Sequence, residues 1–342
     1  MLALASQPAA PYVQLSEVDE PRPMAHEALV QVRTISLNRG ECRRLETMDP
    51  GSVTGWDLAG VVVEPAADGS GPAAGARVVG LKNGGAWVQR AAVDTEFLTE
   101  LPDTITFEQA ATLPVAGLTA LLSLQIGGFV VGRRVLVTGA SGGVGRFAIQ
   151  LAKLAGAHVT GLARRTDGLR ELGADDVIGE LTAEGEEFDV ILDGVGGTVL
   201  GTCMQRVSAG GTVISFASTV TEPVSYPARE FFARASGARL VGFYLFAVLA
   251  HSRSASADPA PALRARRRRP RGSADRRRQA VDRGRLGDRR VAEPARRRQG
   301  GADRFVSRSG DHRARHCNDR PRPTSIPRIR SKCCCGFVRY CR

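Results

Sequence analysis

The sequence contains no hydrophobic run long enough to cross a membrane. Its longest apolar stretch near the middle, LVGFYLFAVLA at 240–250, is about half of the ~20 residues that a membrane-spanning helix needs. The N-terminus, MLALASQPAAPYVQL, lacks the positive region and the long apolar segment of a secretory signal. We therefore expect a cytoplasmic protein with no membrane anchor.

Cysteine is scarce in the first 250 residues, where only Cys42 and Cys203 occur. Two cysteines so far apart give no disulfide framework, which is typical of a reduced, intracellular protein. Four closely spaced cysteines, the usual ligands of a structural zinc ion, are also missing from this part of the chain.

Positive charge is in deficit before residue 250 and in large excess after it. Residues 1–250 carry 19 basic and 27 acidic side chains, a net charge of −8. Residues 251–342 carry 27 Arg, one Lys and 8 acidic side chains, a net charge of +20. A uniformly basic chain would indicate a nucleic-acid-binding protein, whereas this split indicates an acidic body joined to a basic tail.

The first hundred residues show the short apolar alternation of half-buried strands. We predict strands at 28–37, 58–64, 76–81 and 86–93, separated by glycine-rich turns such as PAADGSGPAAG. From Thr106 the residues TFEQAATLPVAGLTALLSLQ favour helix, with one proline interrupting them. This part of the chain is therefore predicted to be mostly β.

A second architecture begins after Gly132. RVLVTG at 134–139 is a continuous apolar strand of the kind that a parallel sheet buries. The helix that follows, GVGRFAIQLAKLAGA, is predicted to place Val144, Ala148, Leu151 and Ala155 on its apolar face. Further short strands are predicted in HVTGLA, DDVIG, FDVILDGVG, GTVISFA and RLVGFYLF. Six strands alternating mostly with helices predict a doubly wound parallel sheet.

The segment LVTGASGGVGRF carries the chemistry of this second part. Its glycines lie where a strand ends and a helix begins, the place where the pyrophosphate of a dinucleotide approaches the backbone. Ala140 stands where the strict G-x-G-x-x-G fingerprint has its first glycine, and Gly142 and Gly145 fill the other two places. The predicted cofactor-binding residues here are Gly139, Ser141, Gly142, Gly143, Val144 and Gly145.

Two arginines favour one dinucleotide over the other. An acidic residue about 20 positions after the glycines holds the ribose of NAD, whereas arginine there accommodates the 2′-phosphate of NADP. Arg164 and Arg165 follow HVTGLA at that distance, and no acidic residue takes their place. The sequence therefore predicts NADPH as the cofactor, the alternative being a solvated arginine pair at a strand end.

The motifs GWDLAGVVVE, LPVAGLTALLSL and VLVTGASGGVG together resemble the medium-chain dehydrogenase/reductase superfamily, and more narrowly its zinc-independent, quinone-oxidoreductase-like branch. The resemblance covers about residues 10–248. It implies an α/β protein with a GroES-like catalytic domain at 1–120, a Rossmann domain at 121–250, and a cofactor cleft between them. It also implies a small-molecule substrate.

The resemblance further bears on metal binding. Zinc-dependent relatives carry G-H-E-x-x-G where this chain has GWDLAG at 55–60. Trp56 replaces the histidine ligand, and an indole does not coordinate a metal. His26 and His158 have no ligand partner nearby in sequence. We predict no metal.

Without a metal, hydrogen-bond donors must polarise the substrate. Asn38 matches an asparagine of the family's active-site segment, and Arg43 stands where many members have a tyrosine. Lys82 and Tyr244 are weaker catalytic candidates. By the same resemblance Thr119, Gly194, Val195 and Ala217 are expected to border the cofactor.

The tail, residues 251–342, has no apolar periodicity. We interpret it as disordered and frameshifted, because the segment RQGGAD at 298–303 can be encoded by codons that read Gly-Lys-Ala-Val-Leu one base later, like the family's closing segment. The alternative is a basic arm that binds nucleic acid non-specifically through phosphates. It has only three aromatic residues, so base stacking is not supported.

Together these features predict an NADPH-dependent, metal-free oxidoreductase that transfers hydride to a quinone, an enone or another activated carbonyl. One alternative is an enoyl reductase acting on acyl thioesters. Another is a non-catalytic cofactor binder whose tail engages nucleic acid. RLVGFYL as an edge strand would allow a homodimer.

Overall fold

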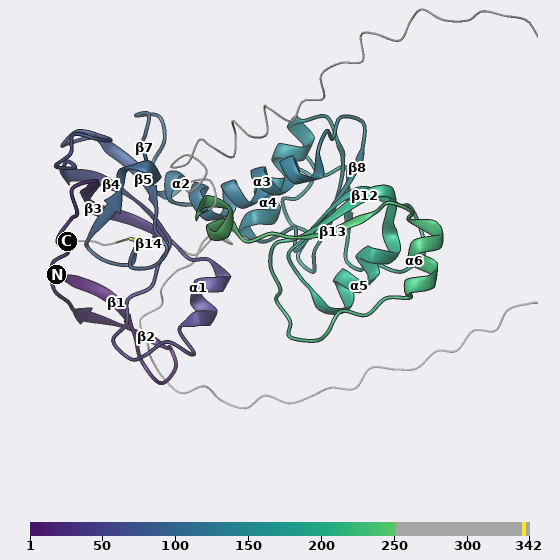
Figure 1. Cartoon of the computed structure of the whole chain (residues 1–342), viewed down its shortest axis with the longest axis horizontal. Helices are drawn as coiled ribbons and strands as arrows, with labels where there is room; N and C mark the ends of the chain where they lie inside the picture. Colours follow the sequence, from purple (N-terminus) through teal and green to yellow (C-terminus); the bar gives the residue numbers. More distant parts are fainter. Residues whose placement is uncertain (251–336, 340–342) are drawn as a thin grey trace, which may run out of the picture. The chain divides into compact units, whose positions relative to one another are not determined.

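The computed structural model describes residues 1–250 and 337–339 of the 342-residue chain. They form a curled antiparallel sheet with a small two-stranded partner, followed by a parallel sheet covered by helices (Figure 1). This confirms the predicted α/β class with a GroES-like part and a Rossmann part. Within the described residues, no helix has the length and apolar content needed to span a membrane.

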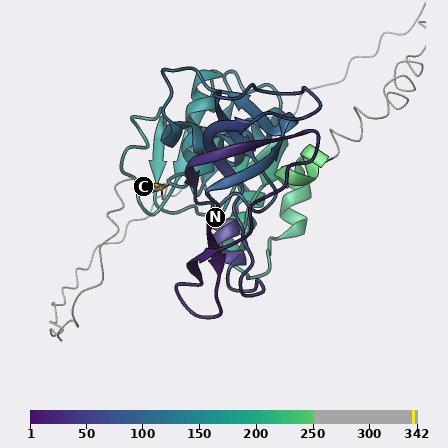
Figure 2. The same ribbon diagram turned by 90° about the vertical axis from the view of Figure 1, so that its left-hand side faces the viewer.

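The antiparallel sheet is built on one long strand, β3 (Glu27–Ser36). Its partners and neighbours are β4 (Asp57–Glu64), β5 (Arg77–Leu81), β6 (Arg90–Asp94) and β7 (Leu98–Glu100), and β1 (Leu2–Ser6) pairs with β2 (Val13–Glu17). Ala28, Val30 and Val32 alternate into the core, as the sequence predicts. This sheet faces the viewer in Figure 2.

Three helical pieces connect the two sheets. They are α2 (Phe107–Ala111), the π-helical turn η2 (Leu113–Gly117) and α3 (Leu118–Gly127), after the short α1 (Arg39–Arg44) earlier in the chain. Pro114 is the second residue of η2, and because proline has no backbone N–H it cannot continue the hydrogen bonds of α2. The predicted interruption is therefore present, and α3 runs across the predicted domain boundary at residue 120.

The parallel sheet has the six predicted strands. They are β8 (Arg134–Thr138), β9 (His158–Leu162), β10 (Asp176–Ile178), β11 (Phe188–Asp193), β12 (Val207–Ser215) and β13 (Arg239–Gly242), in the order β10-β9-β8-β11-β12-β13. All neighbours are parallel. The strand order reverses between β8 and β11, which is where doubly wound sheets bind their ligands.

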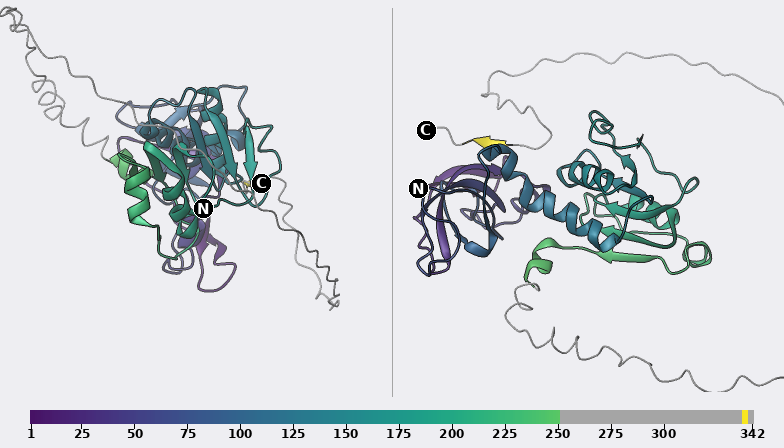
Figure 3. Two further views of the ribbon diagram at one scale, coloured as in Figure 1. Left: turned by 90° about the vertical axis from the view of Figure 1, so that its right-hand side faces the viewer. Right: turned by 90° about the horizontal axis from the view of Figure 1, so that it is seen from above.

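Helices cover both faces of this sheet (Figure 3). Val135 and Val137 pack in one core cluster with residues of α3 and of α4 (Gly143–Leu154), while Leu136 packs in another cluster with α5 (Gly197–Arg206). The helix α6 (Ala228–Arg234) contributes to the second cluster.

The predicted apolar face of α4 is partly wrong. Its buried residues are Gly145, Ala148, Ile149 and Ala152. Ala155 is exposed beyond the end of the helix, and Val144 and Leu151 are only half-buried. The face is rotated because Gly145 must lie against the preceding turn, and the small residues Ala148 and Ala152 share its side of the helix.

One further strand comes from the tail. β14 (Phe337–Arg339) pairs antiparallel with residues Thr34–Ser36 of β3. These three residues lie within the tail that the sequence predicts to be disordered, and in the structure they form an edge strand of the antiparallel sheet. The rest of 251–342 lies outside the described residues. The frameshift and nucleic-acid hypotheses concern those residues, and both stay predictions.

Candidate functional site

The predicted cofactor residues gather at one edge of the parallel sheet. The turn from Gly139 to Gly145 follows β8, the pair Arg164 and Arg165 follows β9, Gly194 and Val195 follow β11, and Ala217 follows β12. In a parallel sheet the carboxyl ends of all strands meet at the same edge. The structure therefore brings together segments that are up to 78 residues apart in sequence.

Two positions in the turn between β8 and α4 require glycine. Gly139 has a φ of +61°, and its carbonyl accepts a hydrogen bond of 2.9 Å from the amide of Gly142. A Cβ on Gly145 would lie 2.6 Å from the Gly139 oxygen and 2.7 Å from the Cα of Ala140. The glycines at the N-terminus of α4 leave its backbone N–H groups approachable, which suits the pyrophosphate of a dinucleotide.

A buried carboxylate holds the neighbouring loop. Asp193, at the end of β11, is fully buried and accepts hydrogen bonds from Thr138 Oγ1 (2.7 Å), Val195 N (3.2 Å) and Gly196 N (3.1 Å). Burial raises the pKa of Asp193, and these hydrogen bonds oppose the rise. The loop is thereby fixed beside Gly139, where a Cβ would lie 3.5 Å from a methyl group of Val195.

Replacing Asp193 with asparagine is expected to lower the free energy of unfolding by about 1–3 kcal/mol. The amide nitrogen of asparagine cannot accept a hydrogen bond. Either the backbone N–H of Val195 or that of Gly196 therefore loses its acceptor. Urea unfolding of the full chain measures the change. Asp176→Asn, with an exposed side chain at the start of β10, is the matched control and should change stability little. Equal stability of the wild type and Asp193→Asn would contradict the role of the carboxylate.

Arg43 ties the first part of the chain to the cofactor edge. Its guanidinium donates to the backbone oxygens of Ser218 (3.2 Å) and Thr219 (3.1 Å), in the segment after β12. Thr219 in turn donates from its backbone N–H to the oxygen of Val195 at 2.8 Å. The position at which many family members have a tyrosine thus carries a structural contact in this chain.

Asn38 lies at the start of α1 in a buried polar cluster, and the N–H groups of its side-chain amide are engaged there. Its Nδ2 donates to Asp57 Oδ2 (2.6 Å) and to Glu41 Oε1 (3.0 Å). Asp57 also accepts from the hydroxyl of Ser36 and, at 2.9 Å, from the backbone N–H of Val115. In this arrangement Asn38 positions two carboxyl groups.

The two carboxyl groups of this cluster hold protons unusually well. Burial, followed by the charge of Asp57, raises the pKa of Glu41 to about 8, against the lowering effect of hydrogen bonds from Asn38. Burial also raises the pKa of Asp57 to about 6. Sequence reasoning missed this pair, although the spacing of Asn38 and Glu41 is that of a helix capping box and was available as a signal.

The remaining candidates are placed less favourably. The ammonium of Lys82 donates to the oxygen of Ala92 at 2.7 Å and lies 4.0 Å from a carboxylate oxygen of Glu27, so it is held within the antiparallel sheet. Tyr244 follows β13 and is 57% exposed. Thr119 is buried in the first turn of α3. The roles of these residues stay predictions.

The predicted absence of a metal also stays a prediction. Trp56, which stands where zinc-dependent relatives have a histidine ligand, is buried. Throughout residues 1–250, no group of three His, Cys, Asp or Glu side chains is arranged to hold a metal ion.

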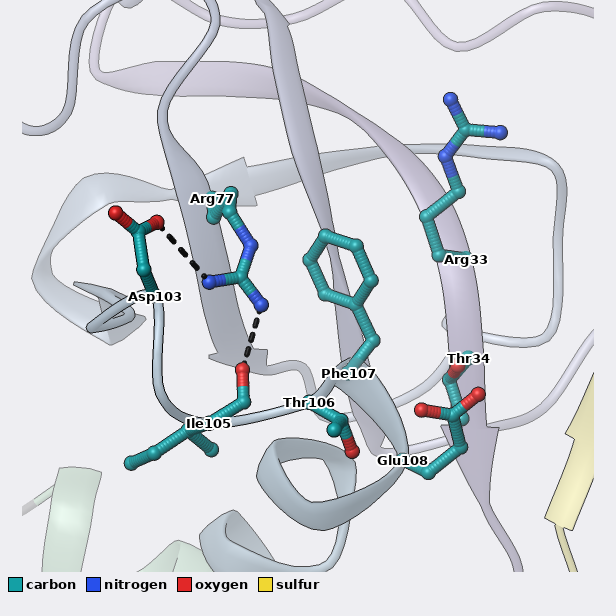
Figure 4. A pocket seen from close by; sticks show the side chains of 8 residues that line it. All are labelled: Arg33, Thr34, Arg77, Asp103, Ile105, Thr106, Phe107 and Glu108. Atoms are coloured by element: carbon teal, nitrogen blue, oxygen red, sulfur yellow. Dashed lines mark hydrogen bonds and ion pairs between the residues drawn. The ribbon is translucent and has the colours of Figure 1, made fainter.

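A pocket of about 440 Å³ lies elsewhere, on the antiparallel sheet (Figure 4). Arg77 crosses it, donating to the carboxylate of Asp103 at 3.4 Å and to the oxygen of Ile105 at 2.5 Å, with Phe107 beneath its guanidinium. The pocket contains none of the predicted site residues. We therefore assign the candidate site to the edge of the parallel sheet.

Comparisons with known proteins show which proteins this chain resembles. The family model described as "Zinc-binding dehydrogenase" matches residues 143–255. A chloroplast envelope quinone oxidoreductase homolog from Arabidopsis thaliana is 34% identical over 224 residues, covering 58% of this chain and 68% of the relative. A 2-methylene-furan-3-one reductase from Solanum lycopersicum is 34% identical over 194 residues, covering 50% of this chain and 48% of the relative.

A solved structure shows the same fold. The quinone oxidoreductase from Coxiella burnetii superposes with a TM-score of 0.62 at 27% sequence identity. The superposition covers 71% of this chain and 82% of that one.

Proposed function

The chain belongs to the medium-chain dehydrogenase/reductase superfamily, among its quinone-oxidoreductase-like proteins, and we propose that it is an NADPH-dependent, metal-free reductase of quinones, enones or other activated carbonyls. The observation that carries this proposal is the glycine-rich turn before α4, where a Cβ on Gly145 would clash with the backbone, together with the arginines after the next strand. The names of the relatives support both a quinone and an enone as substrate class.

Each part of the edge has a role in this proposal. The backbone of 139–145 receives the pyrophosphate, and Gly194, Val195, Ala217 and Thr119 border the nicotinamide end. The nicotinamide cofactor supplies the hydride when it is bound. The protein's own contribution is to orient the two reactants, to exclude water and to polarise the acceptor oxygen.

The arginines after β9 support NADPH in particular. Arg164 and Arg165 are both exposed, directly beyond the buried Ala163. Arg146 of α4 adds a third cation, because its guanidinium lies 3.6 Å from the position that a Cβ on Gly168 would occupy. Sequence reasoning missed Arg146, since only the fold brings α4 beside the loop after β9. The three cations are opposite in sign to a 2′-phosphate and can donate hydrogen bonds to its oxygens.

Removing Arg164 and Arg165 together, by substitution with alanine, is expected to weaken NADPH binding roughly 10- to 100-fold and to leave NADH binding unchanged. Fluorescence titration with each cofactor measures this. The matched control is the pair Arg133→Ala and Arg134→Ala, which removes the same charge at the amino end of β8. Tighter binding of NADH than of NADPH by the wild type, or an equal loss in the control, would overturn the NADPH assignment.

An enoyl reductase acting on acyl thioesters is the second candidate, because it would use the same turn and the same cofactor. Turnover of a panel containing a quinone, an enone and a 2-enoyl thioester separates the two. The third hypothesis, a non-catalytic cofactor binder whose tail binds nucleic acid, concerns tail residues outside those that the structure describes. The cytoplasmic location also stays a prediction.

A homodimer is part of the proposal. β13 is the last strand of the parallel sheet, and among the described residues only β12 pairs with it. Leu240 on this strand is 47% exposed, and Phe232 of the preceding α6 is 66% exposed. A free strand edge beside apolar side chains favours pairing with a second copy.

A further inference from the structure

The indole N–H of Trp56 is a buried hydrogen-bond donor without an acceptor among the described residues. Trp56 is only 8% exposed, and within this part of the chain its Nε1 atom is fully covered and has no hydrogen-bond partner. An indole N–H is a donor only, so no alternative arrangement of protons satisfies it. Unsatisfied buried donors are costly and rare in native proteins, and each one calls for an explanation.

The position of the indole supplies that explanation. Its outer ring edge lies under α1, where a Cβ on Gly40 would be 2.7 Å from the Cη2 atom of Trp56. Phe246, which comes after β13, places its ring centroid 5.3 Å from that of Trp56. The next residue is Asp57, whose carboxylate is held by Asn38. Trp56 therefore lies between the first part of the chain and the segment that leaves the cofactor edge.

We propose that the Trp56 Nε1–H group donates a hydrogen bond to the carbonyl oxygen of the substrate, taking over the polarising task that zinc performs in the zinc-dependent relatives with histidine at this position. This inference rests on the proposed reductase function. Because Nε1 is covered in this structure, binding of the substrate's oxygen requires a neighbour of the indole to move, and the proposal assigns this movement to the Phe246 ring that packs against Trp56.

The chemistry suits a metal-free site. An indole N–H stays protonated at every pH at which the protein is folded, so it remains a donor beside the titrating carboxyl groups of Glu41 and Asp57. In an apolar surrounding a fixed donor stabilises negative charge on an oxygen more strongly than it does in water. Trp56 packs in the apolar cluster that contains Leu81, Val115 and Leu245.

The test observes the indole directly. The chain contains two tryptophans, so a ¹H–¹⁵N spectrum shows two indole N–H signals, which Trp56→Phe and Trp87→Phe assign. The probe is tetramethyl-1,4-benzoquinone, whose fully substituted ring does not add cysteine thiols. We expect its addition to the full chain to move the Trp56 signal downfield, with the Trp87 signal unmoved.

Affinity gives a second readout. Trp56→Phe keeps an aromatic ring but removes the donor, and it is expected to raise the Kd of the probe roughly tenfold, about 1.4 kcal/mol. Trp87→Phe is the matched control, because it removes the other buried indole N–H from the core of the antiparallel sheet. An unchanged Kd in Trp56→Phe, or the same loss in both variants, would overturn the inference.

The outcomes separate this inference from the function on which it rests. If the probe perturbs backbone signals of the protein but leaves the Trp56 indole signal in place, the donor assignment fails while quinone binding stands. If the probe perturbs no signal although NADPH binds, quinone reduction and the donor assignment both fail.

Discussion

Replacing Gly145 with alanine is expected to weaken NADPH binding at least ~100-fold, which corresponds to about 2.7 kcal/mol. The new methyl group would lie 2.6 Å from the oxygen of Gly139 and 2.7 Å from the Cα of Ala140. Both contacted atoms belong to the backbone of the turn, so no flexible side chain can yield. Either α4 must move away from β8 or the turn must open, and both changes withdraw the backbone that receives the pyrophosphate.

Fluorescence titration of NADPH measures this effect, and circular dichroism shows whether the sheet is retained. The matched control is Gly179→Ala, which adds the same methyl group after β10, where a Cβ meets no atom within 4 Å. The control should bind NADPH like the wild type. Wild-type affinity in Gly145→Ala would show that the turn does not hold the cofactor.

The parallel sheet was the easiest part to predict. Its strands are short continuous apolar runs that end in glycine, serine or charge, and strand and helix alternate along most of the chain. These patterns arise because a parallel sheet is buried on both faces. The six predicted strands are therefore present, although β13 ends at Gly242, where the apolar run continues to Phe246.

The antiparallel part was predicted less completely. The strands β1, β2 and β7 escaped notice because each has only 3–5 residues and owes its pairing to partners that the sequence does not reveal. Leu15 in β2, for example, is 57% exposed, so the apolar residues of this strand do not mark a buried face. Whether such a short segment forms a strand depends more on its pairing with a neighbouring strand than on its own side chains.

In the candidate site, too, local motifs were predicted and contacts between distant residues were not. The glycine turn and the arginine pair were predicted, because each belongs to one short segment with one local geometry. The contacts of Asp193, Arg43 and Trp56 could not be predicted, since each depends on residues brought close only by the fold. Trp56 was noted only as the replacement of a metal ligand, and its unsatisfied donor became visible once its neighbours were known.

The stability of this protein is expected to fall as pH rises from about 5 to about 8, because of the buried pair in α1 and β4. The pKa of Glu41 is raised by burial from an ordinary 4.5 to about 8. Between those values the folded chain keeps a proton that the unfolded chain releases, so higher pH favours unfolding. Asp57, whose pKa burial raises to about 6, acts in the same direction over the lower part of that range.

Glu41→Gln is expected to remove most of this pH dependence, since glutamine keeps the neutral shape of the protonated acid at every pH. Its free energy of unfolding relative to the wild type should rise by on the order of 3 kcal/mol between pH 5 and pH 8. Urea unfolding at several pH values measures the difference. Glu46→Gln, an exposed change of the same charge just after α1, is the matched control and should follow the wild type. A constant difference between Glu41→Gln and the wild type over this range would mean that Glu41 is ionised in the folded protein, with its charge neutralised by partners other than a proton.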